Sequence, residues 1–274
     1  MLSVNTNQGA MIALQYLNNT QGQMSTTQSA ISTGLKVASA KDDGATYAIA
    51  QNMRGNVAGY QAVTESIDRA MSTVDVAMSA SQSISDLLIQ MKQKALSASD
   101  ISIDTASRQA LNQDFIALRD QISTITKNAV FNGYNLIDGS TNQITALASS
   151  DGTRRITVSA QKLSLSGTIV TVKSTGTIST QAKASTMIAT VQASLTNVNA
   201  AMAKLSAGGK KYSVQLNFTQ KLSDTLTSGI GHLVDADMAV ESARLTSLQT
   251  KQQLGVQALS IANQAPQTIL SLFQ

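Results

Sequence analysis

The chain is organised around its two ends, and the C-terminal end, residues 235–274, reads DADMAVESARLTSLQTKQQLGVQALSIANQAPQTILSLFQ. This stretch has the apolar spacing of an amphipathic helix that continues to the end of the chain. No charged side chain occurs in residues 252–274, and none occurs in residues 1–35, because Lys36 is the first charge from the other end. Two long helical ends, each apolar on one side and made of Gln, Asn, Ser and Thr on the other, are an unusual surface to expose to water. We therefore expect both ends to find partners.

The N-terminal end, residues 1–35, has the period of a coiled coil. Side chains recur at alternating steps of three and four residues, which is the spacing of one helix face packed against a partner helix. The expected seam consists of Ala10, Leu14, Leu17, Gln21, Met24, Gln28, Ile31 and Leu35. Its two glutamines weaken the seam but select one register, and Gly34 is expected to end the helix.

Three internal segments repeat this spacing and predict further helices. A turn at 39–44 and a short helix to residue 56 are expected to precede the first of them. The stripe over 57–98 consists of Tyr60, Val63, Ile67, Ala70, Val74, Ala77, Ser81, Ile84, Leu88, Met91 and Ala95. The second, capped by Asp104 or Thr105, carries Leu111, Phe115, Leu118, Ile122, Ile125 and Ala129. The third, from about residue 185, carries Ile188, Val191, Leu195, Val198, Met202 and Leu205. Gly208 and Gly209 are expected to shift the register of this helix without ending it.

Residues 134–184 have a different character. Short runs typical of β-strands replace the helical period at 143–148, 154–159 and 168–173, and the Ser-Asp-Gly sequence at 150–152 is a hairpin signal. This Ser- and Thr-rich segment is predicted to form a small set of β-hairpins. The last helix is expected to begin behind Asp235 or Asp237.

The order of these elements is nearly palindromic, so nested closure of the chain is the simplest fold. We predict a mainly α fold, in which long antiparallel helices form a coiled coil and a helical bundle from paired N- and C-terminal segments, with a small β-hairpin insert at the tip. The predicted domains are a terminal coiled-coil domain (1–35 and 235–274), a helical-bundle domain (36–140 and 185–234) and a variable β-hairpin insert (141–184).

Composition excludes several classes of protein. The chain has 274 residues, no Cys and one Pro, so a disulfide framework and thiol chemistry are excluded. The chain contains no run of about 18 apolar residues, so no membrane span is predicted. The start of the chain lacks the positive charge and continuous apolar core of a cleavable secretory signal, so export would use another route. The net charge of +4 is scattered, which argues against a nucleic-acid partner.

No catalytic, cofactor or metal site is predicted. His232 is the single histidine, so a His-based triad or metal cluster would have to centre on it, and a structural role is favoured. The fragment Gly229-Ile-Gly231 lacks the Lys-Ser/Thr of a phosphate loop and follows no strand. We therefore predict that the protein is not an enzyme.

Two pairs of carboxylates could serve acid–base chemistry or bind a divalent cation. The pairs are Asp42 with Asp43, next to Lys41, and Asp235 with Asp237. Both pairs directly precede predicted helices, where a negative charge favours the N-terminal end of the helix dipole. Capping of the connections between domains is therefore the preferred interpretation.

The terminal pair offers little apolar burial for its length. Ordering about thirty-five backbone residues at each end costs more conformational entropy than one narrow seam returns. We therefore expect residues 1 to about 35 and about 235 to 274 to be largely disordered in the monomer and to fold on association.

Several motifs resemble those of bacterial flagellin. The main one is ISTGLKVASAKDDGATYAIA at residues 31–50. Others are SVNTN at 3–7, LQYLNNT at 14–20, FNG at 131–133, DADM at 235–238, LSIANQAPQ at 259–267 and LSLF at 270–273. The resemblance covers about 1–140 and 185–274, around a variable middle, and is closest to the short flagellins of alphaproteobacteria.

This resemblance implies a structural subunit that polymerises, alone or mixed with other flagellins, into the extracellular filament for swimming motility. The termini would pair as a coiled coil around a central channel, the inner helices would form the outer tube, and the insert would project outward. It also implies unfolded export through the flagellar type III apparatus without a cleaved signal peptide. The implied partners are an export chaperone on the C-terminal helix and the filament cap and hook-junction proteins, with no nucleic acid and no membrane insertion. The alternative is a hook–filament junction or adaptor protein.

The seam pattern and the resemblance together assign subunit assembly to one set of residues. They are Ala10, Leu14, Leu17, Met24, Ile31, Leu35, Leu245, Leu248, Val256, Leu259, Ala262, Ile269, Leu270, Leu272 and Phe273. In the insert, the hydroxyl groups of Ser174, Thr175 and Thr177 are candidates for glycosylation, on the expectation that they are exposed.

Overall fold

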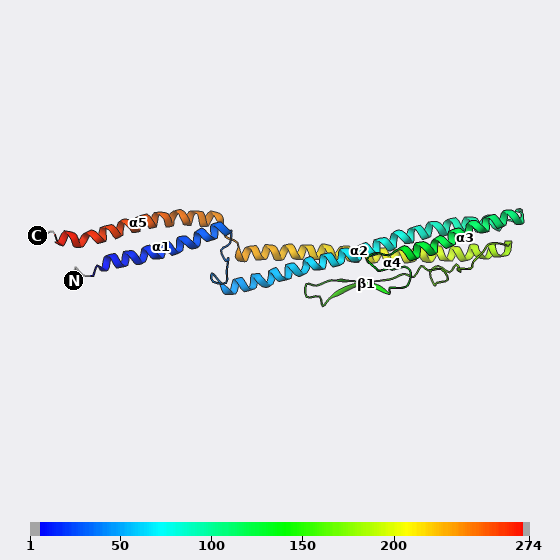
Figure 1. Cartoon of the computed structure of the whole chain (residues 1–274), viewed down its shortest axis with the longest axis horizontal. Helices are drawn as coiled ribbons and strands as arrows, with labels where there is room; N and C mark the ends of the chain where they lie inside the picture. Colours follow the sequence, from blue (N-terminus) through cyan, green and yellow to red (C-terminus); the bar gives the residue numbers. More distant parts are fainter. Residues whose placement is uncertain (1–5, 271–274) are drawn as a thin grey trace. The chain divides into compact units, whose positions relative to one another are not determined.

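The computed structural model describes residues 6–270, and the side chains of these residues up to 264. Its elements are α1 (Gln8–Thr33), α2 (Gly44–Ala98), α3 (Thr105–Asn128), β1 (Gln143–Leu147), β2 (Arg155–Ser159), α4 (Gln181–Val234) and α5 (Met238–Leu270) (Figure 1). The expected mainly α fold of long antiparallel helices with a small β-hairpin is confirmed.

The chain forms two compact units. The first unit consists of Met1–Gly55 and Thr225–Gln274, and the second consists of Asn56–Asp224. The first unit therefore contains α1, α5, the beginning of α2 and the end of α4. The second contains α3, the hairpin and the greater part of α2 and α4.

The core of the second unit follows the predicted stripe of α2. Every residue of that stripe is buried except Tyr60, which is half-buried. Phe115 and Ile122 of α3 and Val191, Val198 and Leu205 of α4 are buried in the same cluster. The 3-4 spacing places all these side chains on one face of each helix, which is why the three helices share one core.

Helix α2 is longer than the sequence predicts. The expected boundary between a short helix ending at residue 56 and a second helix from residue 57 is wrong, because α2 runs without interruption from Gly44 to Ala98. No proline lies in this stretch to break the backbone hydrogen bonds. Helix α3 begins behind Asp104, whose side chain accepts a hydrogen bond from Ser107 N. Asp104 and not Thr105 is therefore the cap.

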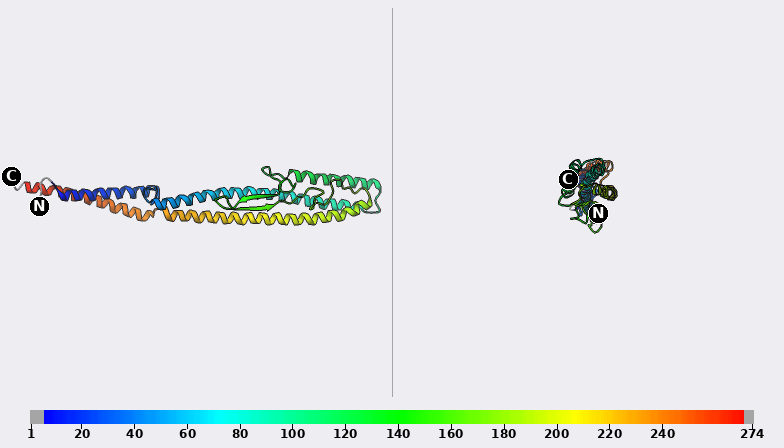
Figure 2. Two further views of the ribbon diagram at one scale, coloured as in Figure 1. Left: turned by 90° about the horizontal axis from the view of Figure 1, so that it is seen from below. Right: turned by 90° about the vertical axis from the view of Figure 1, so that its right-hand side faces the viewer.

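The hairpin lies against the side of α2 and α4, and its expected position at the tip is wrong. Strands β1 and β2 pair antiparallel, with Gly152 at a φ of 70° in the connecting turn. Leu147 N donates to Ser66 Oγ on α2 at 3.1 Å, and Tyr212 Oη on α4 donates to Ile144 O at 3.0 Å. Both views of the ribbon show the hairpin alongside these helices (Figures 1 and 2). The insert therefore packs along the long helices of the second unit, and its buried side chains belong to the same core.

The third predicted strand, 168–173, is wrong as well. This segment is irregular, although Val170 and Val172 are buried in the core. The backbone of this segment and of the residues after it is bound by side chains, since Thr171 N donates to Ser194 Oγ at 3.0 Å and, further on, Ile178 N donates to Asn112 Oδ1 at 2.7 Å. Because helices α3 and α4 supply these acceptors, the segment is held in place without a strand partner.

Adjacent glycines in α4 are expected to respond to alanine in opposite directions. A Cβ at Gly208 would lie 2.5 Å from Val158 Cγ1 on β2, whereas a Cβ at Gly209 would lie 3.7 Å from Val74 Cγ1 on α2. Gly208→Ala is expected to lower the free energy of unfolding by about 1–3 kcal/mol, since the stiff valine and its strand must move. Gly209→Ala is expected to raise it by up to about 1 kcal/mol through helix propensity. Urea unfolding of the two variants checks both signs, and destabilisation by both would refute the assigned contacts.

Candidate assembly surface

The two terminal helices pair antiparallel in the first unit. Asn7 Nδ2 donates to Ala262 O at 2.6 Å, and Gln252 Nε2 donates to Gln21 Oε1 at 2.8 Å. Between these contacts, a Cβ at Gly255 would lie 3.4 Å from Leu17 Cδ1. As the contacts advance along α1 they move back along α5, so one continuous register joins the two ends (Figure 1). The hydrogen bond between the two glutamine side chains gives the polar group of Gln21 a partner on the other helix of the seam.

The turns beside the pair join residues from both ends of the chain. Helix α1 ends at Gly34, which has a φ of 71° that favours glycine. Leu35 and Asp235 form an antiparallel bridge, in which Ala236 N donates to Gly34 O at 2.8 Å. Lys36 N donates to Val234 O at 2.8 Å on the same connection. The backbone therefore fixes the register where α1 meets the start of α5.

Carboxylates bind the first backbone N–H groups of the helices that follow them. Asp43 Oδ1 accepts from Ala45 N at 3.0 Å and from Thr46 N at 3.1 Å at the start of α2. A further hydrogen bond from the Thr46 hydroxyl holds the pKa of the Asp43 carboxyl below its usual range. Asp237 Oδ1 accepts from Ala239 N at 2.9 Å at the start of α5. Both have the geometry of helix N-caps.

The other residues assigned to these connections have different roles. Asp42 Oδ2 closes the turn before α2 by accepting from Ser39 N at 2.8 Å. Asp235 contributes a backbone contact, since Asp235 N donates to Gly231 O at 2.8 Å. Its side chain is exposed and binds no helix N–H group within the described residues. The Lys41 side chain is exposed. His232 is exposed near the end of α4, and its carbonyl oxygen accepts from Lys36 Nζ at 3.1 Å.

The structure separates the residues assigned to assembly into two groups. Most are buried or half-buried: Ala10, Leu17, Met24, Ile31, Leu35, Leu245, Leu248, Leu259 and Ala262. Among them, Leu35 lies beyond α1 and packs against the cluster of Val37, Ala50 and Val234. Leu14 and Val256 are exposed. The side chains of Ile269 and Leu270, and all of Leu272 and Phe273, lie outside the described residues.

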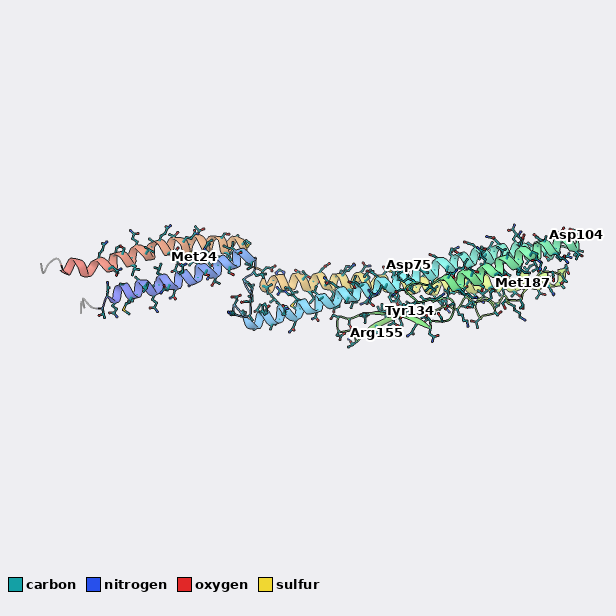
Figure 3. All side chains as sticks on the ribbon, in the orientation of Figure 1. Met24, Asp75, Asp104, Tyr134, Arg155 and Met187 are labelled. Atoms are coloured by element: carbon teal, nitrogen blue, oxygen red, sulfur yellow. The ribbon has the colours of Figure 1, made fainter. Side chains whose placement is uncertain are left out.

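Three positions of the predicted seam of α1 are exposed, namely Leu14, Gln21 and Gln28, although Gln21 still bonds to Gln252 on α5, and Thr27 is buried in place of Gln28. A straight helix drifts by about 20° per heptad from a strict 3.5-residue repeat, so the buried side moves to the neighbouring residue. Met24, which is buried, marks the middle of the seam (Figure 3).

Further apolar side chains on these helices are exposed, and the sequence analysis did not single them out. They are Met11, Ile12 and Tyr16 on α1 and Met238, Val240, Leu254 and Ile261 on α5. Tyr16 is 70% exposed. The 3-4 spacing predicts one apolar stripe on each helix, and these side chains lie outside that stripe. Monomeric proteins rarely leave so many large apolar side chains exposed on two helices, so α1 and α5 are a candidate interaction surface.

The interior of the first unit is thin. In α1, only Met24, Thr27 and Ala30 are buried, and among the described side chains of α5 only Leu248 is buried. The separate apolar cluster of Val37, Ala50 and Val234 lies at the connections. The second unit, by contrast, has one large continuous core. The paired ends therefore bury far fewer side chains than the second unit, which is the feature expected of a segment with low local stability.

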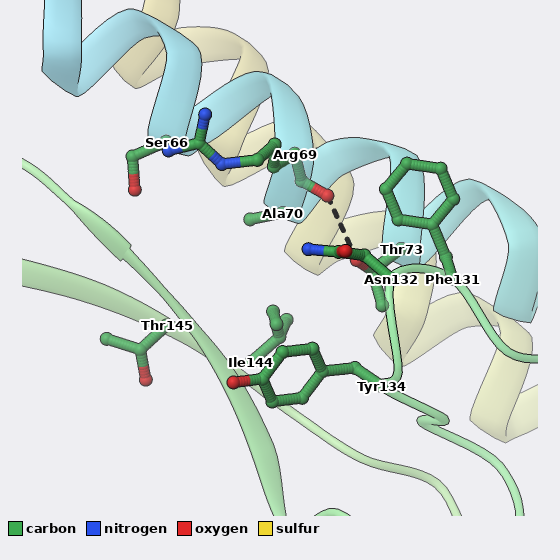
Figure 4. A pocket seen from close by; sticks show the side chains of 9 residues that line it. All are labelled: Ser66, Arg69, Ala70, Thr73, Phe131, Asn132, Tyr134, Ile144 and Thr145. Atoms are coloured by element: carbon green, nitrogen blue, oxygen red, sulfur yellow. Dashed lines mark hydrogen bonds between the residues drawn. The ribbon is translucent and has the colours of Figure 1, made fainter.

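A polar pocket of about 140 Å³ lies on the second unit. Its walls are Ser66, Arg69, Ala70 and Thr73 of α2, Phe131, Asn132 and Tyr134 of the loop after α3, and Ile144 and Thr145 of β1 (Figure 4). Thr73 Oγ1 donates back to Arg69 O at 2.9 Å. The walls include a guanidinium group and hydroxyl groups without a carboxylate or an imidazole, so they offer no acid–base pair.

Within residues 6–270, no helix is long and apolar enough to cross a membrane. The same part of the chain brings together no three His, Asp or Glu side chains around a common metal position. Among the glycosylation candidates, Ser174 and Thr175 are exposed, whereas Thr177 is half-buried.

Two family models match the chain. The bacterial flagellin N-terminal helical region matches residues 4–142, and the bacterial flagellin C-terminal helical region matches residues 188–273. The chain is 52% identical over 272 residues to flagellin FljK of Caulobacter vibrioides, covering 99% of this chain and 98% of the relative. It is 34% identical to a flagellin of Brucella melitensis, with full coverage of both chains.

Two solved structures share the fold. A putative flagellar hook-associated protein from Vibrio parahaemolyticus aligns with a TM-score of 0.59 at 12% identity, covering 71% of this chain and all of that one. The crystal structure of Bacillus cereus flagellin aligns with a TM-score of 0.50 at 21% identity, covering 56% of this chain and 88% of that one. At these identities the likeness concerns the fold alone.

Proposed function

The chain belongs to the bacterial flagellin family, and we propose that its paired terminal helices form the inner part of a filament. The protein is a structural subunit, not an enzyme, and polymerises with itself into the extracellular filament of the bacterial flagellum. The junction or adaptor alternative is not favoured, because the relative at 52% identity over almost the whole chain is a flagellin.

The observation that carries the proposal is the exposed apolar surface of α1 and α5, which is free of charge along the whole of α1 and from residue 252 onward in α5. In the filament, residues 1–35 and 235–274 would act as one inner domain, and side chains such as Leu14 and Val256 would be covered by neighbouring subunits. Residues 36–140 and 185–234 would form the outer tube, with the insert 141–184 on its surface. The absence of charge in 1–35 and 252–274 lets the helices line a wet channel without binding passing chains electrostatically.

Association would also complete the folding of the ends. The thin interior of the first unit supports the proposal that α1 and α5 are largely disordered in the free monomer and become ordered when neighbours bury their outer faces. Disorder of the ends suits export of an unfolded chain through the flagellar type III apparatus without a cleaved signal peptide. The lack of Cys and the single Pro remove slow steps from refolding at the distal end.

The same surface accounts for the further partners that we propose. An export chaperone would cover the exposed side of α5, including Leu254 and Ile261, before export. The filament cap and hook-junction proteins would contact the first and last subunits of the polymer. Ser174 and Thr175 are exposed hydroxyl groups that remain proposed glycosylation sites, and the intact mass of the secreted protein tests this.

Electron microscopy of the purified protein after salt-induced polymerisation tests the filament role. A filament subunit is expected to form long tubes of uniform diameter without any other protein. An adaptor present in a few copies would not polymerise freely. Absence of tubes even when sheared filaments are added as seeds would contradict the proposed function.

A further inference from the structure

Helix α4 carries two exposed lysines on the side that faces away from α2. Gly209 marks the side towards α2, because a Cβ there would lie 3.7 Å from Val74 Cγ1. Lys204 and Lys211 are five residues before and two residues after Gly209, so they lie about 140–160° around the helix from it. Both are exposed, and neither forms an ion pair within the described part of the chain.

An open groove of about 530 Å³ runs beside Lys211. Its walls are Ile156 of β2 and Ala207, Lys210, Lys211, Val214 and Gln215 of α4. Val214 is 69% exposed, and Phe218, one turn further along α4, is 57% exposed. This face of α4 therefore combines positive charge with uncovered apolar surface, which is a combination suited to a partner with negative charge.

Helix α2 carries two exposed aspartates on the side that faces away from the hairpin. Gly59 and Ser66 mark the side towards the hairpin, since both contact it directly. Asp68 is nine residues after Gly59 and Asp75 is nine residues after Ser66, so each lies about 180° around the helix from a hairpin contact. Figure 3 shows Asp75 on the edge of α2 away from Arg155 of the hairpin.

These two aspartates are available for a partner. Neither forms an ion pair or a side-chain hydrogen bond with any residue that the structure describes. Their acidic neighbours on α2 are occupied, since Glu65 pairs with Arg69 at 3.7 Å and Asp86 accepts from Gln82 Nε2 at 3.1 Å. The acidic face of α2 and the basic face of α4 thus both lack their counter-charges.

The charges on the two helices have the same spacing. Asp68 and Asp75 are seven residues apart, as are Lys204 and Lys211, which corresponds to about 10.5 Å along each helix. Within one subunit α2 and α4 run antiparallel, so in a second copy of the same orientation α4 also runs against α2. Asp68 then meets Lys211 while Asp75 meets Lys204.

One displacement brings both pairs level. Within one subunit, two contacts give the antiparallel register of α2 and α4: Val74 lies beside Gly209, and further along Lys92 Nζ donates to Gln192 Oε1 at 2.6 Å. In this register, Asp75 of α2 lies at the same height along the axis as residue 208 of α4. Lys204 is four residues beyond that point, or about 6 Å along the axis. Asp68 and Lys211 are offset along the helix axis by the same distance and in the same direction. A single shift of the neighbouring copy therefore aligns both pairs.

We propose that α2 of one subunit packs laterally against α4 of a second copy, with Asp68 opposite Lys211 and Asp75 opposite Lys204. The inference rests on the proposed filament function and adds to it a contact made by the second unit. The two faces belong to different helices, so the contact is head-to-tail and can repeat without closing, as an open helical polymer requires. The occupant of the groove beside Lys211 is therefore another copy of this chain.

Charge reversal in the full-length protein tests the pairing. Lys204→Asp with Lys211→Asp, and separately Asp68→Lys with Asp75→Lys, are each expected to raise the critical concentration for polymerisation by about tenfold or more, because like charges then face each other. The variant with all four reversals is expected to return to within about threefold of the parent, as coupled pairs require. The matched control for the lysine reversal, Arg155→Asp with Lys173→Asp, lowers the net charge by the same amount at exposed residues of the insert and is expected to polymerise normally.

Zero-length cross-linking of parent filaments gives a second readout that does not depend on any variant folding. A water-soluble carbodiimide joins a carboxylate to an amine only when the two are in contact. In filaments mixed from isotopically light and heavy subunits, the peptides joining Asp75 to Lys204 or Asp68 to Lys211 are expected to include products of one light and one heavy chain, which a contact within one subunit cannot give. The same treatment of monomers is expected to give neither product.

The outcomes separate this inference from the filament function. The pairing would be overturned, and the filament role left intact, by parent filaments without either cross-link, by double reversals that leave the critical concentration unchanged, or by a quadruple reversal that does not restore polymerisation. Failure of the parent protein to polymerise would instead overturn the filament role.

Discussion

Protein lacking residues 1–35 is expected to remain soluble and helical but to form no filaments. The core of the second unit contains no residue from this segment, so its three helices keep all their buried contacts. Helix α5, however, loses the partner that covers Leu248 and the backbone bridge from Leu35 to Asp235. The inner part of the filament then cannot assemble.

Circular dichroism and sedimentation of the fragment check that it folds, and electron microscopy after salt addition checks for tubes. Seeding with sheared filaments of the full-length protein distinguishes a fragment that cannot nucleate from one that cannot add to a filament end. The fragment is expected to fail at both. Normal polymerisation of the fragment would show that pairing of the ends is not what organises the assembly.

A single charge in the seam is expected to have nearly as large an effect. Leu248 of α5 is 3% exposed, and Leu248→Asp places an unpaired carboxylate where the leucine packs against α1. Burial of such a charge costs about 3 kcal/mol or more, which corresponds to a rise of about a hundredfold in the critical concentration for polymerisation. The melting of the second unit is expected to stay unchanged, because Leu248 is not part of its core.

Gln249→Asp is the matched control, since it adds the same charge at the next residue, which is exposed. This variant is expected to polymerise within about threefold of the parent, as surface substitutions usually cost little. Leu259→Asp and Ile31→Asp are expected to act in the same direction as Leu248→Asp, and less strongly because both side chains are half-buried. Equal effects of Leu248→Asp and Gln249→Asp would mean that charge alone, without burial, disturbs assembly.

The helices and the main core could be predicted from sequence because one simple repeat controls both. The 3-4 spacing from Val63 to Ala95 places the side chains on one face, and the structure buries that face. The cap at Asp104 and the break at Gly34 could be predicted because each rests on local chemistry. The family could be recognised from motifs at both ends of the chain.

The insert could not be predicted in detail because its structure depends on distant residues. The backbone at Thr171 is held by Ser194, and that at Ile178 by Asn112, so no local pattern distinguishes this segment from a strand. The position of the hairpin depends on Gly208, where the absence of a side chain leaves room for Val158. Neither contact can be read from the spacing of apolar residues.

The assembly surface was only half predictable. A seam accounts for residues such as Met24 and Leu248, which are buried within the pair. Exposed residues such as Tyr16 and Leu254 lie on other sides of the same helices, and a search for one stripe per helix misses them. The equal spacing of Asp68 and Asp75 with Lys204 and Lys211 is present in the sequence, but its meaning depends on knowing which faces are free.

Amide hydrogen exchange, measured on dilute monomer and on filaments of the same preparation, tests most directly whether the ends fold on association. The α2 stripe around Ile67 and Ile84 is expected to be strongly protected in both states and serves as the internal reference. In the monomer, α1 and the described part of α5 are expected to exchange within about tenfold of the unfolded-chain rate. In the filament they are expected to be protected as strongly as α2. Strong protection of both ends in dilute monomer would contradict the account.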